Sequence, residues 1–269
     1  FSIGGNYYKE DGVLINNNAQ RYGMRANSDF KVSKWIKVGE SMNVSRNDQT
    51  SSASQLNTAL TASPLMPIYN SANAGGFMGP EPRYVGTNDI TNPVAEMTYN
   101  KTNKTNTRIL SAIYAEITPT FIKGLTYKFD FGYDYMLSNW DTWIPIYELP
   151  SSGARGKNYN ELTKSNSTNR RWNVTNMLTY HTSFGAVSAE GEEKPHDLVV
   201  QVGQEAMADD GNNFTAVGRL FSDEEYNVFD MADSGLKPTG QISSYRLYSY
   251  LGRLLYNYKG KYLLTVNVR

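Results

Sequence analysis

The sequence contains no cysteine, and this absence excludes two classes of site. Without cysteine the chain has neither a disulfide framework nor a Cys-ligated metal site. Histidine is scarce as well, with only His181 and His196 present. A lone histidine is more often structural or solvated than a ligand, so neither residue predicts a metal or catalytic centre. We therefore expect no cofactor.

An excess of charge of either sign is also missing. Lysine and arginine together number 26, and aspartate and glutamate together also number 26. No basic stripe is visible, so nothing indicates a nucleic-acid partner. The segment "GARGK", Gly153 to Lys157, has the wrong spacing for a phosphate-binding loop. Acidic groups near Glu192 and at Asp223 to Glu225 are typical of solvated loops. We find no Ser/His/Asp arrangement with supporting context and predict no enzyme.

Long hydrophobic runs are absent too. No stretch approaches the ~18 apolar residues of a membrane-spanning helix. The mean hydropathy of −0.54 would ordinarily indicate a soluble protein. Hydropathy does not detect β-barrels, however, because apolar and polar residues alternate along each strand and average out.

Strict alternation is what the sequence does contain. In "LTYKFDFGYDY", Leu125 to Tyr135, the odd positions are Leu, Tyr or Phe, and the even positions are polar or Gly. A soluble domain would bury the apolar face in its core, whereas a membrane barrel would turn it toward lipid. Moving even an uncharged polar group into a dry core costs on the order of 2–7 kcal/mol, and a charged group costs more. We therefore predict a wet lumen on the charged side, faced by Arg25, Lys128, Asp130 and Asp134.

About nine such strands alternate with short and long connections. Short turns are expected around Ser33, at 118–124, at 191–195 and at 259–261. Long connections are expected at about 46–107, at 151–169 and up to about Thr239, with one helix-like piece at 52–62. Hairpin turns require antiparallel neighbours. Short turns on one side and long loops on the other are typical of outer-membrane barrels. The fold class is thus all-β, an antiparallel transmembrane β-barrel segment forming an open, curved sheet.

Aromatic residues gather near the expected strand ends. They are Trp35, Phe121, Phe184, Tyr258 and Tyr262 beside short turns, and Tyr133, Tyr135, Trp140 and Trp172 beside long loops. Aromatic side chains favour the two lipid–water interfaces of a membrane, so two such groups are typical of the two aromatic girdles of a barrel. High β-propensity explains the number of aromatics, but not where they gather.

The stretch "NWDTWIPIY" is the candidate ligand site. Trp140, Asp141, Trp143 and Tyr147 would suit stacking on sugar rings, with a carboxylate as hydrogen-bond acceptor. The alternative is that these residues belong to the girdle and to an extracellular extension of the strand.

Several segments resemble SusC/RagA-type TonB-dependent outer-membrane transporters. They are "RYGMRANSDFKVSKWIKVGESMNVS", "LNTALTASPLMPIYN", "HDLVVQVGQE" and "SYLGRLLYNYKGKYLLTVNVR". The last is the most specific, and it departs from the family pattern at Leu255. The resemblance keeps the family's order over nearly the whole chain.

That resemblance implies a barrel of about 22 strands with an internal plug. It implies uptake of a large nutrient, glycan or peptide, across the outer membrane of a Gram-negative, Bacteroidetes-like cell. Implied partners are a SusD-like surface lipoprotein, outer-membrane lipid, and the TonB–ExbB–ExbD system acting through a plug and TonB box. We expect residues 1–269 to be a slice of that barrel, with plug, TonB box and C-terminal strands outside it.

Two other functions stay open at this stage. One is a non-transporting outer-membrane barrel or adhesin, and the other is a secreted glycan-binding β domain. The sequence does not name the substrate, because specificity lies in loops and partner surfaces.

Overall fold

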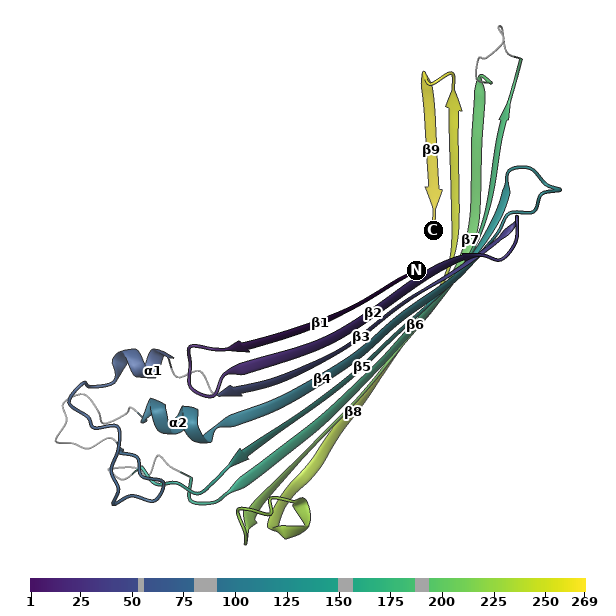
Figure 1. Ribbon diagram of the computed structural model, residues 1–269. Coiled ribbons are helices and arrows are strands. Elements are labelled where there is room, and N and C mark those ends of the chain that lie inside the picture. Colours follow the sequence, from purple (N-terminus) through teal and green to yellow (C-terminus); the bar gives the residue numbers. More distant parts are fainter. Residues whose placement is uncertain (53–55, 80–90, 150–156, 187–193) are drawn as a thin grey trace.

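In the part of the chain that the structure describes, nine strands form one antiparallel sheet (Figure 1). The computed structural model describes residues 1–52, 56–79, 91–149, 157–186 and 194–269. Each strand pairs with the next in chain order, which confirms the predicted antiparallel hairpin topology. The strands are β1 Ser2–Asp11, β2 Asn18–Lys31, β3 Ile36–Ser52, β4 Lys101–Ile117, β5 Leu125–Ile144, β6 Glu161–Phe184, β7 His196–Phe221, β8 Ala232–Tyr258 and β9 Tyr262–Val268.

The sheet is open and strongly twisted, as Figure 1 shows. Strand β1 pairs only with β2, and β9 only with β8, among the residues that the structure describes. The predicted open, curved sheet is therefore confirmed. Open edges present unpaired N–H and C=O groups, and no such edge is tolerated in hydrocarbon.

The connections sort to two ends of the sheet. The predicted short turns at 32–35, 118–124 and 259–261 link β2–β3, β4–β5 and β8–β9. The predicted turn at 191–195 lies mostly outside the described residues. At the other end are the longer connections and the helices (Figure 1).

The strands run further than the sequence predicts. The long connections are shorter than expected, because β3, β4, β6, β7 and β8 extend into them. This applies to the connections predicted at 46–107, at 151–169 and up to about Thr239. Asn, Ser and Thr in these flanks are typical of loops, yet here they form cross-strand pairs. Examples are Thr102 with Thr142 (2.8 Å between hydroxyl oxygens) and Ser138 Oγ donating to Asn106 Oδ1 (2.7 Å). Strands of 24 to 27 residues exceed the ~9–11 needed to cross a bilayer.

The two faces of the sheet differ in chemistry. Strand pairing puts Phe131 beside Ile113 and Val174, and Tyr133 beside Trp172. Because directly paired residues point the same way, these side chains share what we call the apolar face. The opposite side, which carries Lys128, Asp130 and Asp134, is the polar face.

Charged residues interrupt the apolar face at Glu40 and, in the row of Tyr135, at Arg170 and Asp210. Glu40 lies in the same register row as Ser28, Ile113 and Phe131. It accepts a hydrogen bond from the hydroxyl of Ser28, which is itself 4% exposed (3.1 Å, Oγ to Oε1). The Ser28 hydroxyl offsets part of the cost of placing a carboxylate on this side.

Among the described residues of the long connections lie two short α-helices (Figure 1). Helix α1, Leu56–Thr61, confirms the described part of the helix predicted within 52–62, and residues 53–55 lie outside the description. Helix α2, Pro93–Tyr99, is not predicted from the sequence. Its signal is local: the Asn92 side chain accepts from the Val94 and Ala95 amides, and Pro93 opens the helix, as N-caps and first-turn prolines do. Neither described helix could cross a membrane.

A small buried core forms between α2 and the end of β5. Phe77, Ala95, Tyr147 and Leu149 are each at most 7% exposed. Tyr99 stacks on Tyr147 with ring centroids 4.8 Å apart. We call this group the loop core.

Asn92 ties the loop core together. It is 1% exposed, and its amide nitrogen donates to the carbonyls of Ile68 (2.7 Å) and Met78 (2.9 Å). One side chain therefore caps α2 and anchors the 68–78 segment.

Candidate functional site

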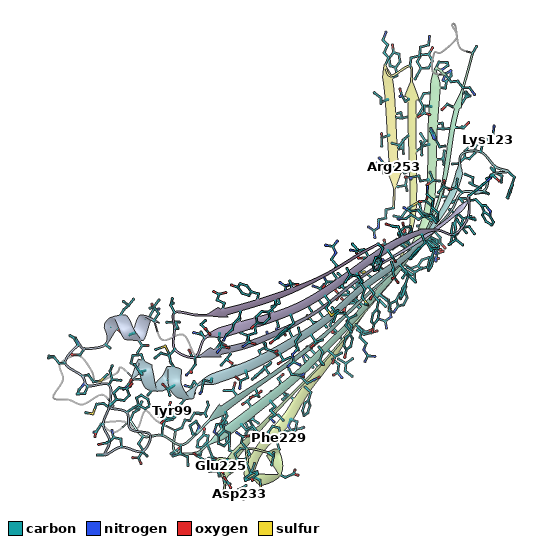
Figure 2. The ribbon with its side chains drawn as sticks, viewed as in Figure 1. Tyr99, Lys123, Glu225, Phe229, Asp233 and Arg253 are labelled. Carbon is teal, nitrogen blue, oxygen red and sulfur yellow. The ribbon has the colours of Figure 1, made fainter. Side chains whose placement is uncertain are left out.

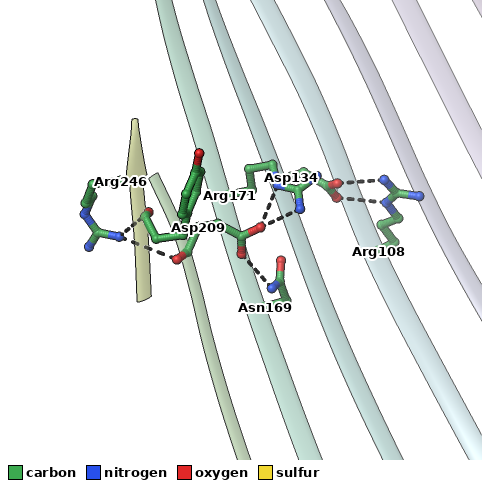
Figure 3. Close-up of polar contacts among 7 residues, drawn as sticks. Arg108, Asp134, Asn169, Arg171, Asp209 and Arg246 are labelled. Carbon is green, nitrogen blue, oxygen red and sulfur yellow. Dashed lines mark hydrogen bonds and ion pairs between the residues drawn. The ribbon is translucent and has the colours of Figure 1, made fainter. Parts of the chain in front are cut away.

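A ladder of alternating charge crosses four strands on the polar face (Figure 3). Arg108 on β4 binds Asp134 on β5 through two hydrogen bonds, Nε to Oδ1 (2.8 Å) and Nη2 to Oδ2 (2.6 Å). Arg171 on β6 binds Asp209 on β7 (Nε to Oδ2, 2.8 Å), and Asn169 also donates to Asp209 (2.8 Å). Bidentate arginine–carboxylate pairs are among the stronger polar contacts in proteins.

The ladder is wet rather than buried. The arginine side chains of both pairs are 52% exposed, and the aspartates are 21% and 20% exposed. Charges in this position interact through water, and each pair contributes about 0–1 kcal/mol. The sheet thus holds its charges in place at little desolvation cost, as a surface facing an aqueous space requires.

The structure brings the four predicted lumen residues to one face. Strand pairing runs Arg25–Asn43–Leu110–Asp134 in a single row. Lys128 and Asp130 follow on the same side of β5 and form an ion pair (2.9 Å). That this face borders a lumen remains a prediction.

A tyrosine organises the polar face near the short turns. The Tyr114 hydroxyl donates to Asp29, while the ammonium groups of Lys37 and Lys128 lie 5.4 Å and 5.3 Å from its ring centroid. Gly39 makes room for the ring, because a Cβ there would overlap Tyr114. Cation–π contacts of this kind contribute about 0.5–1 kcal/mol at exposed sites.

A hollow of about 560 Å³ lies between this cluster and the ladder. Its lining includes the small residues Ala112 and Gly132 and the charged residues Asp130, Asp134 and Arg171. Such a concavity with fixed charges could contact a polar ligand or a polar protein surface.

The predicted aromatic ligand site is divided by the sheet. Trp140 lies on the polar face, since its row partners are Lys104 and Ser165. Asp141 and Trp143 project from the other face. Trp143 packs edge-on against Phe221, with centroids 5.1 Å apart. The ligand role of these residues remains a prediction.

Tyr147, the fourth predicted site residue, belongs to the loop core. Its side chain is 3% exposed, and its hydroxyl donates to Glu96 Oε1 (3.0 Å). Burial, together with the nearby Glu96 carboxylate, raises the pKa of Tyr147 well above the ordinary tyrosine value. In this conformation the ring contacts protein on all sides and is not open to an external ligand.

The ladder partners Arg108, Arg171 and Asp209 are not singled out by the sequence. Their signal is positional, because each falls on the polar side of an alternating strand. Which cation meets which carboxylate depends on register, which alternation alone does not give.

Among the described residues, no group of three or more His, Asp or Glu side chains could hold a metal ion. The His181 ring binds Asp197 (Nε2 to Oδ1, 2.7 Å), and Ser183 donates to the same oxygen (2.7 Å). The serine hydroxyl therefore bonds to the aspartate and not to the histidine, unlike a hydrolase triad.

Comparison with known proteins agrees with this architecture. No family model matches the chain. It is 26% identical over 276 residues to TonB-dependent receptor P3 of Formosa agariphila, which covers all of this chain and 26% of the relative. It is 25% identical over 267 residues to TonB-dependent receptor P26 of the same organism, covering 97% of this chain and 25% of the relative. The chain thus spans about a quarter of the length of these relatives.

Solved structures of similar fold include the RagAB peptide transporter. That structure aligns with a TM-score of 0.70 and 18% identity, covering 94% of this chain and 28% of the other. The RagAB peptide importer in its open-open state gives a TM-score of 0.72 and 19% identity, covering 93% and 27%. At this identity the likeness shows the fold, and the matched region is part of the RagA barrel.

The predicted resemblance to SusC/RagA-type proteins is therefore confirmed, and so is the predicted outer-membrane location. Along its full length the chain is homologous to TonB-dependent receptors, which are outer-membrane β-barrels, and its sheet has the fold of part of such a barrel.

Proposed function

We propose that residues 1–269 form part of the barrel wall of a TonB-dependent transporter that imports a large nutrient, a glycan or a peptide. The observation that carries this proposal is the two-faced sheet. Its apolar face suits lipid, and its polar face holds wet, fixed ion pairs such as Arg108–Asp134. A secreted soluble domain would have to cover the apolar face with other elements, and the described helices lie at one end of the sheet (Figure 1).

The strands fit a membrane crossing followed by an extension. The apolar positions of β5 alternate from Leu125 to Leu137, and the rest of the strand mixes polar residues with Trp140, Trp143 and Ile144. A crossing needs about 9–11 residues of tilted strand. The remaining length, together with the loop core, would then stand outside the bilayer on the long-loop side, where large outer-membrane barrels carry their extracellular loops.

The partners of the whole transporter are part of the same proposal. The matched solved structures are RagAB complexes, and a SusD-like lipoprotein covering the long-loop side fits that likeness. Energy would come from TonB–ExbB–ExbD through a plug and TonB box outside residues 1–269. Within this scheme Trp140, on the polar face beyond the apolar positions, is the aromatic residue best placed to meet a substrate.

The test uses the full-length protein in its own host. Uptake of labelled oligosaccharides and of labelled oligopeptides is measured in wild-type cells, in cells lacking the gene, and in wild-type cells treated with a protonophore. We expect one substrate class to enter only in the untreated wild type. Recovery of the full-length protein in the soluble fraction would refute the proposal. So would uptake that persists both in cells lacking the gene and in wild-type cells treated with the protonophore.

A further inference from the structure

Unpaired lysines gather at the short-turn end of the sheet. Lys31 ends β2 and Lys34 lies in the β2–β3 turn. Lys123 lies in the β4–β5 turn (labelled in Figure 2), and Lys259 and Lys261 flank Gly260 in the β8–β9 turn. All five are exposed, and none forms an ion pair with a residue that the structure describes.

Some cations further along the strands are ion-paired. Lys37 and Lys128 are paired with Asp29 (3.8 Å) and Asp130 (2.9 Å), and the ladder arginines are paired with aspartates. The three described short turns, at 32–35, 118–124 and 259–261, contain lysine but no aspartate or glutamate.

An aromatic stack on the apolar face leads up to the β8–β9 turn. The Phe184 and His196 rings are nearly parallel with centroids 4.8 Å apart, His196 lies 4.9 Å from Tyr258, and Tyr258 lies 6.3 Å from Tyr262. Strand pairing places Phe184, His196 and Tyr258 in one row, with Tyr262 opposite Tyr258.

The two lysines of the turn lie directly over the end of this stack. Lys259 Nζ is 5.7 Å from the Tyr258 ring centroid, and Lys261 Nζ is 5.7 Å from that of Tyr262. Each ammonium group meets a ring that belongs to the apolar face, so the pair of charges is directed to the outside of the sheet and not to the polar face.

This arrangement has the order of groups found across a lipid–water interface. Aromatic rings settle at the level of the headgroups, and lysine chains extend along apolar surface while the ammonium reaches the phosphates. A cation–π contact uses one side of an ammonium group and leaves N–H donors free for an anion. We propose that the 259–261 turn, with Tyr258 and Tyr262, binds the phosphate of an anionic phospholipid in the leaflet on the short-turn side.

The proposal rests on the proposed function, since it requires the apolar face to contact lipid. A lipid is favoured over a soluble anion because the site is continuous with that face. The Tyr258 ring contacts the Lys259 ammonium group and also belongs to the apolar row. Lys34 and Lys123, in the other described short turns, would add to the same positive field.

The experiment uses the full-length transporter reconstituted in nanodiscs of phosphatidylethanolamine, with and without phosphatidylglycerol. Co-purifying lipids are counted by mass spectrometry for wild type and for Lys259→Gln/Lys261→Gln. The matched control is Lys101→Gln/Lys164→Gln, which removes the same charge at the long-loop end, where neither lysine forms an ion pair with a described residue. We expect wild type and control to retain phosphatidylglycerol selectively, and the test variant to lose about fivefold in preference per lysine.

The outcomes separate this inference from the function on which it rests. Barrel formation is checked first by the heat-dependent shift in gel mobility, and failure of wild type to form a barrel overturns the proposed function. A barrel in which test and control variants retain equal phosphatidylglycerol overturns the lipid site alone. If inorganic phosphate removes the preference while chloride of equal ionic strength does not, the site is a general anion site and the lipid assignment is wrong.

Discussion

Asp134 and Arg171 stand directly opposite each other on β5 and β6, and each is held by a further partner on its far side. Arg108 binds Asp134, and Asp209 binds Arg171. Charge therefore alternates along four neighbouring strands. The two inner residues each have opposite charges on both sides, whereas Arg108 has only one.

This order predicts unequal effects from removing single charges. We expect Asp134→Asn to lower the free energy of unfolding by more than Arg108→Gln, because the first leaves two arginines without their shared carboxylate. Both changes are small, about 1 kcal/mol or less, since the groups are partly solvated. Urea unfolding of the full-length protein in detergent measures both. Equal effects, or a larger effect of Arg108→Gln, would show that Asp134 does not serve both arginines.

The face assignment predicts a sharp contrast between neighbours on β5. Phe129→Arg places a charge on the apolar face, at a cost of about 2–4 kcal/mol near the middle of the bilayer. Asp130→Arg places it on the polar face, where water is available. We expect folded full-length protein to fall strongly for the first variant and little for the second, measured by gel-mobility shift in outer-membrane fractions. Equal yields would mean that the two faces are wrongly assigned.

The sequence predicts the fold to the extent that alternation is present. From Leu125 to Tyr135 every second residue is apolar, and the strand is found there. Where Asn, Ser and Thr occupy both faces, as in 161–169, the pattern has no period, yet β6 already begins at Glu161. Strand formation there depends on pairing with β5 and β7, which is tertiary information.

The candidate site shows the same division. Arg25, Lys128, Asp130 and Asp134 come to one face because parity along a strand decides sidedness. Trp140 and Trp143 differ by three positions, so parity alone separates them, although their closeness in sequence suggests one cluster. The burial of Tyr147 depends on Phe77 and Ala95, which are distant in sequence, and no local pattern predicts it.

The raised pKa of Tyr147 predicts that the loop core loses order at high pH. Its pKa is raised by burial and by Glu96, so the folded state favours the neutral phenol. Below the ordinary tyrosine pKa of about 10 this burial carries no charge penalty. As the pH rises above that value, the unfolded form ionises first and stability falls. We expect proteolysis of the long connections to accelerate above about pH 10.

Tyr147→Phe is the control for that experiment. It keeps the ring but removes the ionisable hydroxyl and its bond to Glu96, at a cost of about 1 kcal/mol at neutral pH. The variant should be cut slightly faster than wild type at pH 8 and show a weaker increase above pH 10. An identical pH profile in both proteins would assign the effect to other groups.

The last prediction separates the two tryptophans of β5. Trp140 projects from the polar face, whereas Trp143 packs on Phe221 on the other side, so they provide a matched pair three residues apart. We expect Trp143→Ala to lower the surface abundance of the full-length protein, because it removes an edge-on aromatic contact. The accompanying loss in the free energy of unfolding should be less than the ~3–5 kcal/mol measured for a fully buried aromatic, since Trp143 is only partly buried. We expect Trp140→Ala to leave abundance unchanged and to reduce uptake per molecule, because an aromatic ring on the wet face is free to stack on a sugar or a side chain. Uptake and abundance are measured in the same cells. Normal uptake per molecule in Trp140→Ala would refute a ligand role for Trp140. A fall in uptake per molecule in Trp143→Ala would show that Trp143 takes part in ligand binding.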